Sequence, residues 1–397
     1  MDKTAPCAAL RQGNDDGGEA VRKAEHYKVT LTVRTPVHIG SGAATLKKMY
    51  LYDRKSNMVS FVDTQKLFNL IIDNDLLELY EDFMLRQNCS LTDFLVNQCK
   101  FTSEQLEPVI TNSVSAADAL GERPIADIHR FMRDAHGRVY IPGSSLKGAL
   151  RTALLLDMID ADGQRPQDTF DSFDYRDREA QRVARNHAKQ LETRYLHTVR
   201  IEYEKYGEKK TVKPEDARCD IMHGVSVSDS LPIDDSRIIL CRKDDFSVRG
   251  NKNSINLVRE CLRPGTTVEF VLTLTGGITI EQLRTAVSSY YGRYYDTYVY
   301  SFDAIDKEAQ IDDRDCIVLG GGNGYFGKNI VYAVSGKEKG TRFVSSLLQW
   351  KFYKHRHQND SANYGISPRM LKYTQFNRQY YLFGLCKVEF APINFEV

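Results

Sequence analysis

The stretch Val139-Tyr140-Ile141-Pro142-Gly143-Ser144-Ser145-Leu146-Lys147-Gly148-Ala149-Leu150-Arg151 changes from a strand pattern to a helix pattern within a few residues. A short apolar segment ends at Pro-Gly-Ser-Ser, and the apolar spacing that follows predicts a helix from about Leu146 to Met158. Ser144 or Ser145 is expected to be its N-cap, because short hydroxyl side chains can accept a first-turn amide. A strand that leads directly into a helix indicates a mixed α and β fold.

Upstream of this stretch, residues 27–34 alternate between apolar and polar side chains and predict a half-buried strand. Pro36, Gly40 and Gly42 are expected to end this strand in a loop, and a second strand is predicted at 58–62. The apolar residues of 64–100 have helical spacing, which predicts a helical insertion.

Downstream of the stretch, residues 160–215 are densely charged and predict a solvated helix at 179–200 and a flexible loop at 204–218. Strands are expected at 225–227, 238–240, 267–275, 316–319 and 381–390, and helices at 280–291 and 343–353. This order predicts an α+β fold of two ferredoxin-like (RRM-like) βαββαβ domains with helical insertions. We place these domains at 27–235 and 236–397, after a disordered tail at 1–26.

The composition restricts the kinds of site the chain can carry. The chain has 397 residues, 42% of them hydrophobic, and a formal net charge of +1, so any binding of nucleic acid must depend on local patches. Its eight cysteines have no metal-binding spacing, and no apolar run has the length of a membrane span. We therefore expect reduced thiols, no metal or cofactor, and a soluble cytoplasmic protein without membrane contact.

The helix start at 143–151 is one candidate binding site. Its unpaired first-turn amides suit a phosphate, Lys147 and Arg151 are four residues apart on one face, and Gly148 would let another backbone approach. An ordinary capped helix with exposed basic residues is an equally good interpretation.

The run Gly320-Gly321-Gly322-Asn323-Gly324-Tyr325-Phe326-Gly327-Lys328-Asn329 is a second candidate, because so many glycines indicate backbone held close to a ligand or another chain. It fits part of a nucleotide phosphate loop, but Asn329 stands where that loop needs Ser or Thr, and residues 330–334 do not favour a helix. We expect a cradle for an RNA backbone, contributing little to the core. A mobile hairpin is the alternative.

The segment 336–387 holds ten basic residues against Glu338 and Asp360, a local charge of 10 − 2 = +8, with aromatic residues interleaved. Cations that follow phosphates and rings that stack on bases are typical of single-stranded nucleic-acid binding. Other patterns favour structural roles: a tyrosine stripe at helical spacing (Tyr290, Tyr291, Tyr294, Tyr295, Tyr298) and an acidic solvated loop (Asp303, Asp306, Asp312, Asp313, Asp315).

Several of these motifs, in this order, resemble the RAMP superfamily of CRISPR proteins, and most of all the family of fifth Csm subunits in type III-A effector complexes. The resemblance rests on residues 35–42, 131–134, 140–152, 227–230, 320–328 and 367–372, and it covers roughly 27–390. It implies RRM-like domains, binding to a guide RNA (crRNA) at its 3′-end side and to target RNA, and contact with other Csm subunits, above all the repeating backbone subunit.

The same resemblance implies a role in guide maturation and assembly without catalysis. The expected RNA-binding residues are His38, Gly40, Ser41, Gly42, Arg133, Gly143, Ser144, Ser145, Lys147, Gly148, Arg151, Gly320, Gly321, Gly322, Asn323, Gly324, Tyr325, Lys328, Arg369 and Lys372. The alternative is a RAMP endoribonuclease that processes precursor guide RNA with His38 as general base. No partner acid or nucleophile is evident beside His38 in the sequence.

Overall fold

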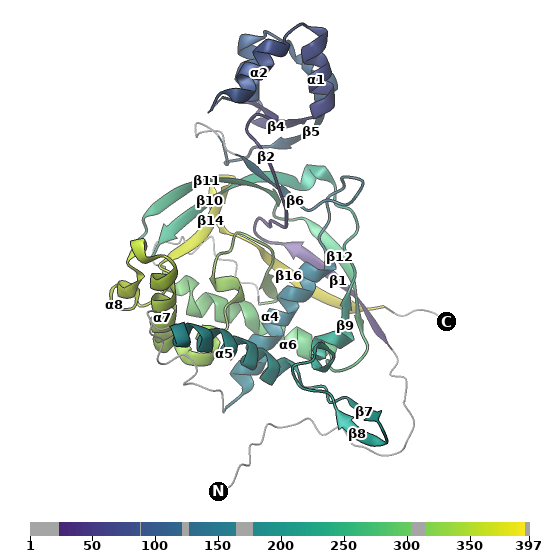
Figure 1. Cartoon of the computed structure of the whole chain (residues 1–397), viewed down its shortest axis with the longest axis vertical. Coiled ribbons are helices and arrows are strands. Elements are labelled where there is room, and N and C mark those ends of the chain that lie inside the picture. The colour runs from purple at the N-terminus through teal and green to yellow at the C-terminus, as the bar shows by residue number, and fades with distance from the viewer. Residues whose placement is uncertain (1–23, 88, 121–126, 164–177, 303–313, 394–397) are drawn as a thin grey trace.

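The computed structural model describes residues 24–87, 89–120, 127–163, 178–302 and 314–393. Most strands belong to two sheets, and the helices pack against them or project at the edges (Figure 1). The mixed α+β class is therefore confirmed. The predicted tail falls largely on residues outside the described part, and the first strand begins at Glu25, two residues before its expected start.

The smaller sheet has the strand order β13-β16-β1-β12-β9, with every neighbouring pair antiparallel. Its strands are β1 (Glu25–Val33), β9 (Val225–Val227), β12 (Thr267–Leu274), β13 (Cys316–Val318) and β16 (Leu385–Pro392). The inward residues of β1 are fully buried, as the alternation of 27–34 predicts.

Two helices cover this sheet, α4 (Gly143–Ala161) and α6 (Ile280–Thr297), and they pack against each other (Figure 1). Along the chain the elements follow the order β1, α4, β9, β12, α6 and β16, which is the βαββαβ pattern of a ferredoxin-like unit. The unit is assembled from segments far apart in the sequence, because the other sheet is inserted between them.

The larger sheet has nine strands, in the order β2-β6-β11-β10-β5-β4-β3, with β14 paired to β10 and β15 paired to β14. Their bounds are β2 (Gly40–Thr45), β3 (Tyr50–Asp53), β4 (Met58–Val62), β5 (Ile110–Ser115), β6 (Ile128–Phe131), β10 (Ile238–Ser247), β11 (Lys252–Leu262), β14 (Met370–Phe376) and β15 (Gln379–Leu382). Both sheets combine strands from either side of residue 235. The division of the chain at 235, and a second ferredoxin-like unit, therefore stay predictions.

The helical insertion forms a lobe of its own at the end of the larger sheet (Figure 1). It contains α1 (Thr64–Asp73), α2 (Leu77–Leu85), a π-helical turn (Asp93–Gln98) and α3 (Ser103–Leu106). Buried apolar residues from these elements make a core separate from the main one. The helices expected at 64–100 are thus present.

Several expected boundaries are wrong, because residues with positive φ that form turns were not recognised from the sequence. The loop expected at 204–218 contains a hairpin, β7 (Glu202–Lys205) and β8 (Glu208–Thr211), with Tyr206 and Gly207 both at positive φ in the turn. The last strand expected, 381–390, is two strands, β15 and β16, separated by Gly384 at a φ of 87°.

The remaining helices are α5 (Arg178–Leu196), α7 (Val331–Lys351) and α8 (Asp360–Tyr364). Helix α7 begins twelve residues before its predicted start, because the burial of Val331, Tyr332 and Val334 stabilises the helix by more than their low helix propensity destabilises it. The helix is kinked at Gly336, whose backbone is not helical. Short 3₁₀ turns lie at Glu107–Val109, Ala217–Cys219, Ile221–Gly224, Asp235–Arg237, Val299–Ser301, Phe326–Lys328, Tyr353–His355 and His357–Asn359. None of the described helices has the length and apolar character needed to cross a membrane.

Candidate nucleic-acid interface

His38 joins two glycine-containing segments that are distant in sequence. Its carbonyl oxygen accepts a 2.8 Å hydrogen bond from the Gly321 amide. A Cβ atom on Gly320 would stand 2.3 Å from the same oxygen, and Gly320 has a φ of 78°, so no larger residue fits there. The start of β2 at Gly40 and the loop 320–324 are therefore held side by side.

The glycine-rich loop is anchored rather than mobile. The Phe326 ring is 3% exposed, and the Gly327 carbonyl accepts a 2.7 Å hydrogen bond from the Tyr290 hydroxyl. The expectation that this loop contributes little to the core is wrong, because Phe326 packs against Tyr298 and Phe302. Of the loop, Gly321, Gly324 and Lys328 remain exposed.

Two asparagines of the loop have structural roles. The Asn329 side chain accepts the Val331 amide at 2.8 Å, at the start of α7. The residue at the magnesium position of a nucleotide phosphate loop is therefore bonded to the protein's own backbone. Asn323, expected to bind RNA, is buried, and its Nδ2 donates to the Gly320 carbonyl at 3.4 Å across the loop. Tyr325, expected to bind RNA as well, is half-buried beside Phe326.

The residues after His38 form an exposed edge beside this loop. Gly40, Ser41 and Gly42 are exposed. A loop was expected here, but the three residues belong to β2, which pairs with β6 and has an irregularity between Gly40 and Ala44. Gly42 has a φ of 85° and open space where a side chain would stand. A backbone so free of side chains can be approached closely by a ligand.

The His38 ring itself is buried, with its Nδ1–H donating to the Glu260 carbonyl at 2.7 Å. Burial lowers the pKa of this imidazole to about 4, and repulsion from Arg259 and His129 lowers it further against the opposing effect of the Glu260 bond. The ring is thus neutral at pH 7. It orders the surrounding backbone and adds no positive charge to the surface.

A cluster of cations lies under the loop. Arg259 of β11 places Nη1 2.8 Å from the point where a Cβ on Gly322 would stand. This nitrogen is buried without a hydrogen-bond partner among the described residues, and burial lowers the pKa of the guanidinium. Burial, then repulsion from Lys372 and Arg259, lowers the pKa of Lys243. An anion bound here would relieve both the repulsion and the unmet donor.

Lys372 completes this cluster, with Nζ 2.6 Å from Asp245 and its stem against Gly324. We call the combined surface the glycine face, defined by Gly40, Ser41, Gly42, Gly320, Gly321, Gly322, Gly324, Lys243, Arg259 and Lys372. Sequence reasoning missed Lys243 and Arg259. No local pattern in 239–245 or 257–261 singles them out, because their basic residues stand beside Asp and Glu. Only the pairing of β10 with β11 brings them together.

The start of α4 does not have the predicted arrangement. Its N-cap is Pro142, and the Asp229 carboxylate accepts the Gly143 amide at 2.8 Å, which replaces a serine cap. Ser144 is exposed and Ser145 is half-buried. A Cβ on Gly143 would stand 2.2 Å from the Val227 carbonyl, whereas Gly148 faces open space. The glycine that permits a close backbone contact is therefore Gly143, not Gly148.

The basic residues of this helix have internal partners. Lys147 donates to the Val225 carbonyl at 2.7 Å, and Arg151 pairs with Asp220 and, at 3.3 Å, with Glu192. These groups join α4 to the segment 220–229 instead of forming an open phosphate site. The alternative of exposed basic residues does not describe this helix, because Lys147 and Arg151 are half-buried, and the phosphate site stays a prediction.

Arg133 and Arg369, also expected to bind RNA, are paired with carboxylates of the chain. Arg133 lies 2.9 Å from Asp235 and 3.4 Å from Glu260, and Arg369 lies 3.1 Å from Asp360. Because Glu260 and Asp360 have no exposed surface, these arginines neutralise buried charge. They are poor candidates for direct contact with phosphate.

The other sequence patterns have the structural roles expected of them or lie partly outside the described residues. The tyrosine stripe of α6 packs into the main core. Asp315 is exposed, and Asp303, Asp306, Asp312 and Asp313 lie outside the described residues. Within the described part of the chain, no group of His, Cys, Asp and Glu side chains is arranged to hold a metal ion.

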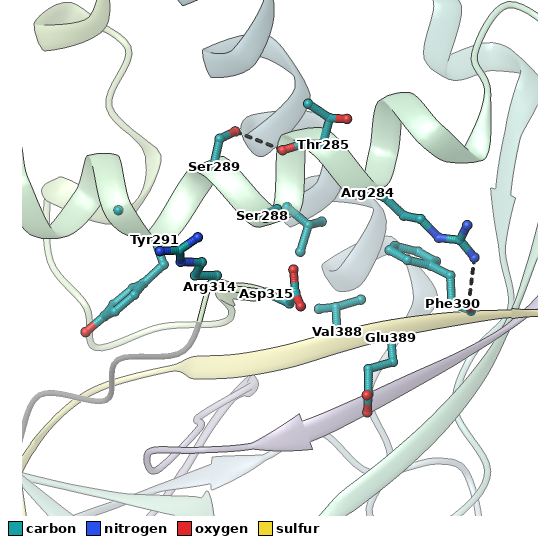
Figure 2. Close-up of a pocket in the computed structure, with 12 residues that line it drawn as sticks. Arg284, Thr285, Ser288, Ser289, Tyr291, Arg314, Asp315, Val388, Glu389 and Phe390 are labelled. Atoms are coloured by element: carbon teal, nitrogen blue, oxygen red, sulfur yellow. Dashed lines mark hydrogen bonds between the residues drawn. The ribbon is translucent and has the colours of Figure 1, made fainter.

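A cavity of about 860 Å³ lies between α6 and the strand β16, and none of the predicted RNA-binding residues lines it (Figure 2). Two arginines, Arg284 and Arg314, and two carboxylates, Asp315 and Glu389, belong to its lining. The Arg284 guanidinium donates to the Phe390 carbonyl at 3.0 Å. Its charges are balanced, so this cavity has no preference for a polyanion.

A family model described as the RAMP superfamily matches residues 30–333. The chain belongs to the RAMP superfamily. RAMP relatives named "CRISPR system Cms protein Csm5" are 25% identical in Enterococcus italicus, 28% in Streptococcus thermophilus and 26% in Mycobacterium tuberculosis. The alignments cover 92%, 78% and 91% of this chain and 98%, 81% and 96% of those relatives, respectively.

Solved structures have the same RAMP fold. The crystal structure of T. onnurineus Csm5 aligns with a TM-score of 0.59 at 17% identity, covering 90% of this chain and 99% of that one. A chain in the cryo-EM structure of a Csm–crRNA–target RNA ternary complex of a type III-A CRISPR–Cas system aligns with a TM-score of 0.56 at 18% identity, covering 91% of this chain and all of that one. The resemblance inferred from the motifs is therefore confirmed.

Proposed function

We propose that this RAMP chain is a non-catalytic RNA-binding subunit of a type III-A Csm effector complex. It caps the 3′-end side of the crRNA and supports crRNA maturation and complex assembly in antiviral defence in the cytoplasm. Its partners are crRNA, target RNA and other Csm subunits, especially the repeating backbone subunit. Relatives named Csm5, aligned over most of this chain, support the assignment, as does the fold shared with a chain of a crRNA-containing complex.

The glycine face is the observation that carries this proposal. Its exposed backbone at Gly42, Gly321 and Gly324 admits a sugar–phosphate chain at close range. The unpartnered Arg259 nitrogen is buried beside Gly322, and the Arg259 guanidinium adds positive charge beneath this backbone. Lys243 and Lys372 add charge beside it, and Lys328 is an exposed cation of the same loop. Because the net charge of the chain is only +1, its affinity for RNA is low in isolation. The affinity rises when neighbouring subunits bind the same RNA.

The same geometry supports a subunit without chemistry. His38, the proposed base of the alternative nuclease, is 6% exposed and bonded to a backbone carbonyl. A pKa of about 4 makes it a weak base at neutral pH. The test is incubation of repeat RNA with the purified chain in EDTA; cleavage that His38→Ala abolishes would replace this proposal with the endoribonuclease.

The binding site is tested by Arg259→Ala with Lys243→Ala in the reconstituted complex, by measuring crRNA affinity over a range of salt. Each lost phosphate contact on a single strand lowers the salt slope by about 0.7, so the double variant should lose about 1.4. The control is Lys28→Ala with Arg218→Ala, which removes two exposed cations paired elsewhere. An unchanged slope, with the variant subunit at normal stoichiometry, would exclude the glycine face.

A further inference from the structure

The end of α7 and the turn after it carry an uninterrupted run of exposed side chains, Trp350-Lys351-Phe352-Tyr353-Lys354-His355-Arg356, which we call the aromatic turn. Trp350, Phe352 and Tyr353 are 39%, 51% and 68% exposed. Large rings contribute to folding when they are buried, so a run of exposed rings adds little to stability. Adjacent exposed rings are more typical of a binding surface.

Half-buried and buried polar side chains hold this turn in one conformation. Gln349 Nε2 donates to the Tyr353 carbonyl at 3.1 Å, Arg369 Nη2 donates to the His355 carbonyl at 2.7 Å, and the Ser345 hydroxyl donates to the His357 carbonyl. Arg356 has a left-handed backbone with a φ of 53°. The rings are thus displayed on a backbone whose hydrogen bonds are already made.

Asp360 is the centre of this support. It has no exposed surface, and its carboxylate accepts from His357 Nδ1 at 2.7 Å, the Ser367 hydroxyl at 2.9 Å and Arg369 Nη1 at 3.1 Å. A buried carboxylate with three donors is costly to disrupt. The turn is therefore ordered before any ligand arrives, which lowers the entropy cost of binding.

The chemistry of the aromatic turn matches single-stranded nucleic acid. Lys351, Lys354 and Arg356 are its charged residues, and it contains no Asp or Glu. Rings offer faces to bases while the cations between them meet phosphates. We propose that the aromatic turn binds a single-stranded nucleic-acid segment by base stacking. The inference goes beyond the proposed crRNA contact, because no residue of the glycine face belongs to the turn.

Trp350 is the single tryptophan of the chain, so its fluorescence reports on this surface alone. The experiment is titration of the full chain with an oligouridylate of about 12 nucleotides, within the usual range of single-strand sites. We expect quenching of Trp350, and affinity about tenfold weaker for Phe352→Ala with Tyr353→Ala, since each stacked base contributes substantially. Lys351→Ala with Lys354→Ala should lower the salt slope by about 1.4.

The matched control is Tyr300→Ala, because Tyr300 and Tyr353 are both 68% exposed; affinity and quenching should not change. Thermal unfolding of each variant verifies that it is folded. Quenching that persists in Arg259→Ala with Lys243→Ala would separate this site from the glycine face. Binding without quenching, or unaltered affinity in the ring variant, would overturn the proposal. Loss of another Csm subunit from the ring variant's complex, with oligouridylate binding intact, would assign the turn to a protein partner instead.

Discussion

The start of α4 and the glycine-rich loop look alike in sequence, since both place glycines beside Lys or Arg, but they differ in the structure. At α4, Lys147 and Arg151 contact oxygens of the chain itself, and Asp229 accepts the first amide. At the loop, the Arg259 nitrogen beside Gly322 lacks a hydrogen-bond partner among the described residues. The first region joins two parts of the fold, and the second contains a buried donor without a partner.

This difference shows that the sequence of a basic, glycine-containing motif does not reveal which group its basic side chains contact. The α4 motif meets carboxylates because residues 220–229 fold back onto it. Beside the loop, Lys372 also contacts the Asp245 carboxylate, but Lys243 and Arg259 repel each other. The same residue types stabilise the fold in one place and favour an external anion in the other, depending on which charges tertiary structure brings near.

The comparison is tested most strongly at Gly143. Gly143→Ala should lower the free energy of unfolding by about 3 kcal/mol, because its Cβ would overlap the carbonyl oxygens of Val227 and Ser228 at 2.2 and 2.3 Å. Backbone atoms cannot yield as a flexible side chain can. Urea unfolding of the full chain measures the change; a loss below about 1 kcal/mol would mean that α4 is not held tightly against this segment.

Beside the glycine-rich loop, the buried His38 ring should make the stability of the protein depend on pH. Its folded pKa of about 4 lies below the unfolded value of 6.5, so the unfolded chain binds more protons between these limits and stability falls as the pH drops through them. The loss from about pH 7 to about pH 5 should be about 2 kcal/mol. His38→Gln removes the titrating group; an equal loss in that variant would assign the effect to other residues.

The basic residues of α4 should affect stability and not RNA binding. Lys147→Ala with Arg151→Ala removes contacts to Val225 and Asp220, and should lower the free energy of unfolding by about 1–2 kcal/mol. The salt slope of crRNA binding by the complex should equal that of the wild type. A smaller salt slope in the variant than in the wild type would mean that Lys147 and Arg151 contact phosphate, as the sequence predicted, and that α4 and the glycine face do not differ in this respect.

The smallest effect is expected at Gly148, the matched control for Gly143 in the same helix. It is exposed and faces open space, so Gly148→Ala should raise the free energy of unfolding by about 0.5–1 kcal/mol through helix propensity alone. The same urea titration measures it. A destabilised variant would reveal a close approach at Gly148 that the geometry does not show.

Local patterns predicted the elements that bury one regular face. Strand β1, helix α4 and the start of α6 were recognised because their apolar residues repeat with the period of the element. Strand β11 and the pairing of β1 with β12 and β16 were not, because register between distant strands depends on contacts that no local window contains.

The α+β class, the RAMP motifs and the glycines at 320–324 could be predicted from the chain alone, since these depend on residue type and local spacing. The partners of the basic residues depended on tertiary structure. It buried His38, paired Lys147, Arg151, Arg133 and Arg369 with internal acceptors, and gathered Lys243 and Arg259 beneath the loop. The physical reason is that a charge binds outward only when no internal partner satisfies it, and partners are brought together by folding.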